Sequence, residues 1–217
     1  RVQKELTLFT HTAMNRLYGE SFIVYNPEFQ ELKIHESYTR QKDGNIVKTP
    51  ENAFVEVLPS AAADAPAYNG LKEMVVVHTG LELGATIYLD YSVITRPGYL
   101  PELDVCEQIE ELSPIREYVL SVSVPENKPL HYELLNGKAV PVVKTAGGVK
   151  TVTWALKNVQ LRPSMLAVSL PAGNVQAIVA STYASKADAL KVIKRQFESN
   201  DKEVSEPVSY THLTLPT

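Results

Sequence analysis

The chain has 217 residues, an apolar fraction of 44%, a charged fraction of 21% and a formal net charge of −4. This length suits one large all-β domain or two small domains, and it allows a core that needs no disulfide framework. The acidic balance argues against a nucleic-acid surface, and no apolar run approaches the ~20 residues of a membrane helix.

Strand-like sequence begins the chain, so we expect an upstream segment before Arg1. Val2–Met14 alternates loosely, and Leu17–Tyr25 ends at Asn26-Pro27. In Glu31–Arg40 the alternation is clear, and the predicted apolar face is Leu32, Ile34 and Tyr38. Asp43-Gly44 predicts a hairpin turn before Ile46–Lys48, because both residues tolerate positive φ.

Two apolar, β-branched runs dominate the middle of the chain. Met74–Thr79 and Ala85–Thr95 are joined by the glycine-bracketed connection Gly80–Gly84. In the second run, Ile87, Leu89, Tyr91 and Val93 share one parity, as in a half-buried strand. We predict that the two runs form the central hairpin of an antiparallel sandwich.

The second half continues with short strands and turns. Arg96–Pro101 predicts a crossing between sheets, and Val105–Leu112 predicts an acidic edge strand. One predicted strand has Tyr118, Leu120, Val122 and Val124 on one face and is ended by Pro125. The remaining predicted strands are Leu130–Leu135, Val149–Leu156, Met165–Leu170 and Val175–Tyr183. Asn136-Gly137 and Gly147-Gly148 are predicted turns.

The pattern changes to helical spacing at Ser185. Ser185 and Asp188 form a capping-box-like start, and Leu190, Ile193 and Phe197 follow as an apolar stripe that needs a partner surface. Many short strands and one helix predict an all-β fold: an antiparallel two-sheet β-sandwich followed by one C-terminal amphipathic helix.

The last ten residues, Val208–Thr217 (VSYTHLTLPT), resemble a translated sequencing adapter. We therefore expect that they are not native sequence and that the gene is interrupted near Pro207. A native C-terminal strand is the alternative. We draw no function from His212 or Tyr210.

Several stretches of the chain together carry a family resemblance. They are Tyr25–Gln30, Ser37–Lys48, Pro66–Gly70, Leu81–Tyr91 (LELGATIYLDY) and Ser113–Pro125 (SPIREYVLSVSVP). These stretches resemble the DUF3857 region of bacterial transglutaminase-like proteins, and the resemblance runs from about Arg1 to Tyr183. It implies a β-sandwich over 1–183 and a helix and linker over 184–207. The adapter-like tail covers 208–217.

The resemblance also implies a context. In such proteins a transglutaminase-like domain with a Cys-His-Asp arrangement follows this region, so that domain is the expected partner, absent from this sequence. These proteins are mostly bacterial, with Bacteroidetes proteins among the most similar, and are typically periplasmic, envelope-associated or secreted. No position matches the family's catalytic motifs, so we assign no catalytic, cofactor-binding or metal-binding residue and no cofactor.

Cys106 is the only cysteine and the obvious candidate nucleophile. A reactive thiol needs a nearby cation or base, whereas Cys106 lies among Asp104, Glu107, Glu110 and Glu111. We therefore interpret it as a structural thiol. The five histidines, at 11, 35, 78, 131 and 212, lack helical metal-site spacing, although a site assembled across strands remains open.

The acidic residues and the aromatic residues can each be interpreted as structural or as functional. The acidic residues around Cys106 match no calcium loop, and a charged edge strand explains them more simply than a cation site or a glycosidase pair. Trp154 and the eleven tyrosines could form a sugar platform. Trp154 shares a face with Val152 and Leu156, however, which favours a core position.

The resulting hypothesis is a non-catalytic accessory module of a larger envelope-associated protein, which packs against another domain or recognises a substrate or partner. The alternatives are a free-standing glycan- or protein-binding sandwich and an enzyme that uses Cys106 or the acidic edge. An exposed aromatic strip would favour glycan binding, and a reactive Cys106 would favour the enzyme.

Overall fold

The computed structural model describes residues 1–64, 70–109, 113–159 and 175–196. The chain divides into two compact units, unit 1 (Arg1–Pro101) and unit 2 (Glu102–Thr217). The described part is mostly β, its strand pairings are all antiparallel, and it has one α-helix. The predicted all-β class with a C-terminal helix is therefore confirmed. The predicted crossing Arg96–Pro101 ends unit 1.

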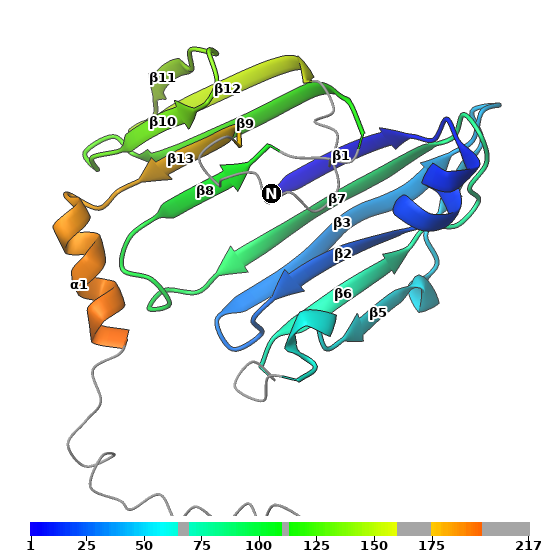
Figure 1. The fold of residues 1–217 in the computed structure, drawn as a ribbon, viewed down its shortest axis with the longest axis horizontal. Coiled ribbons are helices and arrows are strands. Elements are labelled where there is room, and N and C mark those ends of the chain that lie inside the picture. The colour runs from blue at the N-terminus through cyan, green and yellow to red at the C-terminus, as the bar shows by residue number, and fades with distance from the viewer. Residues whose placement is uncertain (65–69, 110–112, 160–174, 197–217) are drawn as a thin grey trace, which may run out of the picture. The chain divides into compact units, whose positions relative to one another are not determined.

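Unit 1 contains two antiparallel sheets (Figure 1). Sheet A has the strand order β1-β7-β3-β4, and sheet B has the order β2-β6-β5. The strands are β1 (Val2–Thr7), β2 (Glu20–Tyr25), β3 (Gln30–Arg40), β4 (Ile46–Lys48), β5 (Phe54–Val57), β6 (Lys72–Val77) and β7 (Thr86–Thr95). A π-helix covers Ala13–Leu17, and 3-10 turns cover Glu51–Ala53 and Ser60–Ala62.

The core of unit 1 lies between these sheets. Ile23 and Val76 from sheet B meet Leu89 from sheet A, and all three are buried. Half-buried apolar residues of β3, β5, β6 and β7 pack around them. The odd-numbered face of β7, predicted from alternation, is therefore the core face.

The predicted central hairpin is wrong. β6 is the middle strand of sheet B, whereas β7 is an inner strand of sheet A, and the two do not pair. The connection carries the chain from one sheet to the other: the His78 N–H donates to the Gly19 carbonyl, and the Gly84 N–H donates to the Leu8 carbonyl. Gly80 has φ +71°, and a Cβ there would lie 2.8 Å from Val47. Alternation shows that both strands have an apolar face, but not which strand lies beside which.

The predicted apolar face of β3 is correct only up to Ile34. Ile34 pairs with Tyr91 and Glu36 with Asp90, so His35 is an extra residue in a β-bulge. The extra residue reverses the parity beyond it. Ser37 and Thr39 are consequently buried, and Tyr38 lies on the opposite face from Leu32 and Ile34.

Unit 2 also contains two antiparallel sheets. Sheet C has the order β10-β13-β8, and sheet D has the order β11-β12-β9. The strands are β8 (Asp104–Gln108), β9 (Ile115–Pro125), β10 (His131–Leu135), β11 (Val142–Ala146), β12 (Val149–Val159) and β13 (Ala177–Ser181). β8 is an edge strand, as the acidic sequence predicted. The described part of the chain thus has four sheets, two in each unit, where the sequence predicted one pair.

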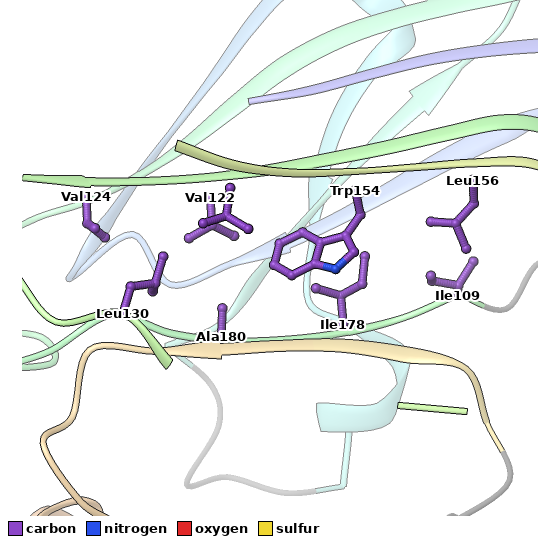
Figure 2. Close-up of a cluster of buried hydrophobic side chains, with 9 residues drawn as sticks. Ile109, Val122, Val124, Leu130, Trp154, Leu156, Ile178 and Ala180 are labelled. Atoms are coloured by element: carbon purple, nitrogen blue, oxygen red, sulfur yellow. The ribbon is translucent and has the colours of Figure 1, made fainter. Parts of the chain in front are cut away.

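The core of unit 2 is a layer of apolar side chains between sheets C and D (Figure 2). Val152, Trp154 and Leu156 of β12 point into it, as predicted, and Ile178 and Ala180 of β13 meet them from sheet C. Trp154 has an exposed fraction of 0%, and its ring packs edge-on against Tyr132 with centroids 5.6 Å apart. The predicted apolar face of β9 is confirmed by buried Val122 and Val124.

The helix α1 (Lys186–Gln196) follows β13. The Ser185 Oγ accepts a hydrogen bond of 3.2 Å from the Asp188 N–H and donates one of 2.7 Å to the Asp188 carboxylate, so the predicted cap is present. None of the helices in the described part of the chain has the length and apolar character to cross a membrane. Met165–Leu170, Phe197, the 197–207 linker and the 208–217 tail lie outside the described residues.

Candidate binding surfaces

Cys106 lies exposed on β8, on the face of sheet C that points away from the core. Through β13, Cys106 is in register with Glu133, and Asp104 is in register with His131. β13 separates each pair by two strand spacings, roughly 9.5 Å. Sheet C therefore places the thiol and the imidazole on one face without bringing them into contact.

The acidic residues around Cys106 do not converge either. Asp104 and Glu107 lie on opposite faces of β8. Glu107 interacts with Tyr118, and both burial and the Glu107 carboxylate raise the pKa of Tyr118. Glu110 and Glu111 lie outside the described residues. Among the described residues, no three His, Cys, Asp or Glu side chains gather as a metal site.

The described histidines differ in environment. His11, His35 and His131 are exposed, whereas His78, directly after β6, is buried. Its Nε2 lies 2.8 Å from the Ser21 hydroxyl, and its buried Nδ1 has no partner among the described residues. Burial, with a smaller effect of Lys4, lowers the pKa of His78 to about 4. A neutral imidazole inside unit 1 is thus a structural group.

The outer face of sheet A carries a buried carboxylate that sequence reasoning missed. Asp90 accepts hydrogen bonds from Arg1 Nε at 2.9 Å, Arg1 Nη2 at 2.5 Å and Gln3 Nε2 at 3.0 Å. The Arg1 guanidinium holds the pKa of the Asp90 carboxyl well below its ordinary range. Beside it, the rings of Tyr38 and Tyr88 stack with centroids 4.8 Å apart. The carboxylate is fully bonded, so this network is built for stability.

A second polar group lies in sheet B. The Tyr25 hydroxyl donates a hydrogen bond to the Glu56 carboxylate, which also forms an ion pair with Lys72 Nζ at 3.2 Å. Burial and the bonded carboxylate raise the pKa of Tyr25 to about 12. Tyr25 is therefore a hydrogen-bond donor over the physiological range, not a base.

The outer face of sheet B carries exposed apolar side chains on either side of a central strand that contributes Val75 and Glu73. We define the sheet B patch as Phe22, Val24, Val55 and Val57. Phe22 and Val24 have exposed fractions of 57% and 50%. Cross-strand register joins Phe22 through Val75 to Val55, and joins Val24 through Glu73 to Val57. The continuous apolar run Phe22–Tyr25 is the sequence signal, because an uninterrupted apolar strand usually has both faces covered.

Helix α1 has a second apolar surface. Leu190 and Ile193 have exposed fractions of 52% and 50%, so in the described structure the predicted stripe is not covered. The polar residues of α1 form contacts within the helix; for example, Lys191 Nζ donates a hydrogen bond of 3.0 Å to the Asp188 carboxylate. An amphipathic helix with an open apolar side is typical of a segment that packs against another surface.

The outer face of sheet D contains a shallow hollow beside strand β11. We call it the β11 hollow; it has a volume of about 450 Å³ and is lined by Val142, Lys144, Ala146, Val149, Thr151 and Thr153. Cross-strand hydroxyl pairs, Ser121–Thr153 and Ser123–Thr151, lie at 2.8 Å on the same face. Trp154 points to the core instead, so it contributes nothing to a sugar platform.

A family model matches residues 1–163, and its description is a Domain of Unknown Function with solved-structure structure (DUF3857). The chain belongs to the DUF3857 family. A solved structure is also similar to this DUF3857 chain: "crystal structure of a putative protease from Parabacteroides distasonis ATCC 8503 at 2.00 Å resolution". The identity is 59%, the TM-score is 0.87, and the match covers 93% of this chain.

The DUF3857 chain spans 40% of the length of that Parabacteroides distasonis protein. No curated protein sequence matches the chain. The comparisons thus establish the family and the fold, and the name of the solved relative belongs to that longer protein.

Proposed function

We propose that this DUF3857 chain is a non-catalytic accessory module of a larger, envelope-associated bacterial protein with a transglutaminase-like domain. In this proposal the module packs against that domain and recognises its substrate or partner. The observation that carries the proposal is the sheet B patch. Contiguous exposed apolar surface is uncommon on monomers and usually marks an interaction site.

Two other observations support this role. The similar Parabacteroides distasonis protein is much longer than the region matched here. In addition, the described positions of Cys106 and His131 give no nucleophile with a contacting base, because β13 lies between them. A reactive acyl-transfer site needs these groups within hydrogen-bond reach.

The packing role is tested by association between separately expressed parts. The partner is the part of the Parabacteroides distasonis protein that this chain does not cover. We expect Phe22→Ser with Val55→Ser to weaken its binding to this chain about tenfold or more, because two apolar contacts of roughly 1 kcal/mol each are lost. Sedimentation velocity measures the complex.

Phe9→Ser is the matched control, because Phe9 is also an exposed phenylalanine in unit 1 but lies outside sheet B. It should leave association unchanged. Equal loss in both variants would contradict the assignment to the sheet B patch. Peptide hydrolysis or amine cross-linking by the purified chain alone would contradict the non-catalytic role.

A further inference from the structure

Strand β11 is the outer strand of sheet D, and its free edge is unpaired within the part of the chain that the structure describes. It pairs with β12 on one side, and no described strand pairs with its other side. All five residues, Val142–Ala146, are exposed. Edge strands of this kind are usually protected by a bulge, a proline or several charges. Within β11 the only such feature is one charge, Lys144.

The turn that follows β11 determines which of its backbone groups are free. Gly147 and Gly148 have φ +58° and +75°, the signature of a two-residue type I′ turn, and Ala146 faces Val149 across it. Ala146 and Val149 are then the hydrogen-bonded pair that closes the hairpin, and hydrogen-bonded pairs alternate along the ladder. The N–H and C=O groups of Val143 and Thr145 therefore point away from β12.

The β11 hollow lies beside this open edge. Val142, Lys144 and Ala146 are on the hollow's side of the strand, together with Val149 and Thr151 of β12. In a strand added to β11, every second side chain would lie on this face. The hollow is long enough along β11 to meet such side chains, and its valines and threonine methyl groups suit small apolar ones.

The charge of this region is opposite to that of the whole chain. From Gly137 to Val159 the sequence has four lysines, Lys138, Lys144, Lys150 and Lys157, and no aspartate or glutamate, although the net charge of the chain is −4. Lys138 and Lys144 are exposed. Only Lys144 lines the β11 hollow, whereas Lys150 donates to the Lys128 carbonyl and Lys157 is in register with Glu117. A carboxylate that reaches Lys144 is thus complementary to this edge.

We propose that β11 binds an extended, acidic peptide segment by strand addition, with the backbone of Val143 and Thr145 forming the hydrogen bonds. This inference rests on the recognition role proposed above and names its ligand class. Strand addition obtains affinity from main-chain hydrogen bonds and selectivity from alternate side chains. Here Lys144 supplies the preference for a carboxylate, and the β11 hollow receives the side chains two residues before and after that carboxylate, because Lys144 and the hollow lie on the same face.

The test uses the whole chain and a blocked heptapeptide of threonines whose second, fourth and sixth residues are valine, glutamate and valine, so that these three side chains share one face. A valine–lysine peptide has lysine in place of the glutamate. Binding is followed by fluorescence anisotropy, and amide hydrogen exchange reports on Val143 and Thr145. We expect saturable binding and slower exchange at these two amides. We also expect at least about tenfold weaker binding of the valine–lysine peptide, because its charge repels Lys144. Absence of saturable binding up to roughly 1 mM peptide overturns the proposal.

Thr145→Pro and Thr145→Ala form the matched pair of variants. Proline removes the outward N–H without removing a ladder hydrogen bond, whereas alanine keeps it. We expect Thr145→Pro to weaken binding about tenfold or more and Thr145→Ala to bind as the wild type does. Trp154 fluorescence emission typical of a buried tryptophan confirms that the variant is folded. Equal binding by both variants overturns the proposal.

A second measurement is independent of folding in the proline variant. The valine–glutamate peptide is N-methylated at the alternate residues whose backbone N–H groups face β11. It then keeps its side chains and charge but cannot donate hydrogen bonds to β11. Loss of binding supports strand addition, and unchanged binding overturns it. If the unmethylated peptide fails to bind while the sheet B patch still mediates association, only the β11 proposal fails.

Discussion

At the residue scale, the molecule uses its unusual polar groups for stability. Asp90 is held by Arg1 and Gln3, and His78 is held by Ser21. Neither could be recognised from the sequence. Asp90 occupies an ordinary polar position of an alternating strand, and its partners Arg1 and Gln3 lie 89 and 87 residues away, just before and on β1. Alternation specifies a face of the sheet but not the residues of the neighbouring strand.

His78 predicts a pH dependence of stability. Its pKa is about 4 in the folded chain against an ordinary value of 6.5. The unfolded state therefore binds the proton more readily, and stability falls as pH decreases from 6.5 toward 4. The loss is of the order of 3 kcal/mol over this window. Urea unfolding between pH 7 and 4 should show a steeper decline for the wild type than for His78→Gln. Identical slopes would show that the imidazole does not titrate this way.

At the element scale, the bulge in β3 shows how one residue decides which face is buried. The strand's alternation is correct on either side of His35, but the two halves are out of phase by one residue. A regular pattern over Glu31–Arg40 cannot reveal this, because Tyr38 and Thr39 are both plausible core residues. The partner strand β7 is regular, and its register fixes where the extra residue must stand.

The bulge gives a deletion prediction. Removing His35 should leave a regular strand in which Ile34 and Ser37 keep their faces, so we expect a cost below about 1 kcal/mol. Removing Lys33 instead shifts the register, so that Leu32 turns outward; if the bulge closes, Ile34 turns outward instead. Either outcome exposes a core side chain, so this deletion should lower the free energy of unfolding by about 2 kcal/mol or more. Urea unfolding of both deletions measures the difference. Equal destabilisation by the two deletions would argue against a bulge at His35.

At the scale of the whole molecule, the chain consists of two units, each with its own core. The length permitted this arrangement, but the sequence pattern favoured a single sandwich over 1–183. Strand patterns in both halves are alike, and only the clustering of contacts separates them. The outer faces of sheets B and D became candidate surfaces only because the structure shows which side chains are exposed there among the described residues.

The separate cores predict separate responses to mutation. Trp154→Ala should destabilise unit 2 by about 3–5 kcal/mol, because a fully buried indole leaves a large cavity. Hydrogen exchange should then accelerate in β9 and β12 and remain unchanged in β6 and β7 of unit 1. Val142→Ala, an exposed change in the same sheet, should cost at most about 0.5 kcal/mol. Equal acceleration in both units would show that they unfold as one.

The sequence by itself determined most strand positions, the Asp43-Gly44 and Gly147-Gly148 turns, the Ser185 cap and the core face that contains Trp154. These features depend on side-chain alternation, positive φ and capping, which act between residues close in the chain. Only the tertiary structure decided that β6 and β7 lie in different sheets, that Asp90 meets Arg1, and that Phe22 and the residues of β11 are exposed. These features depend on which strands become neighbours, and pairing energy comes from residues far apart in sequence.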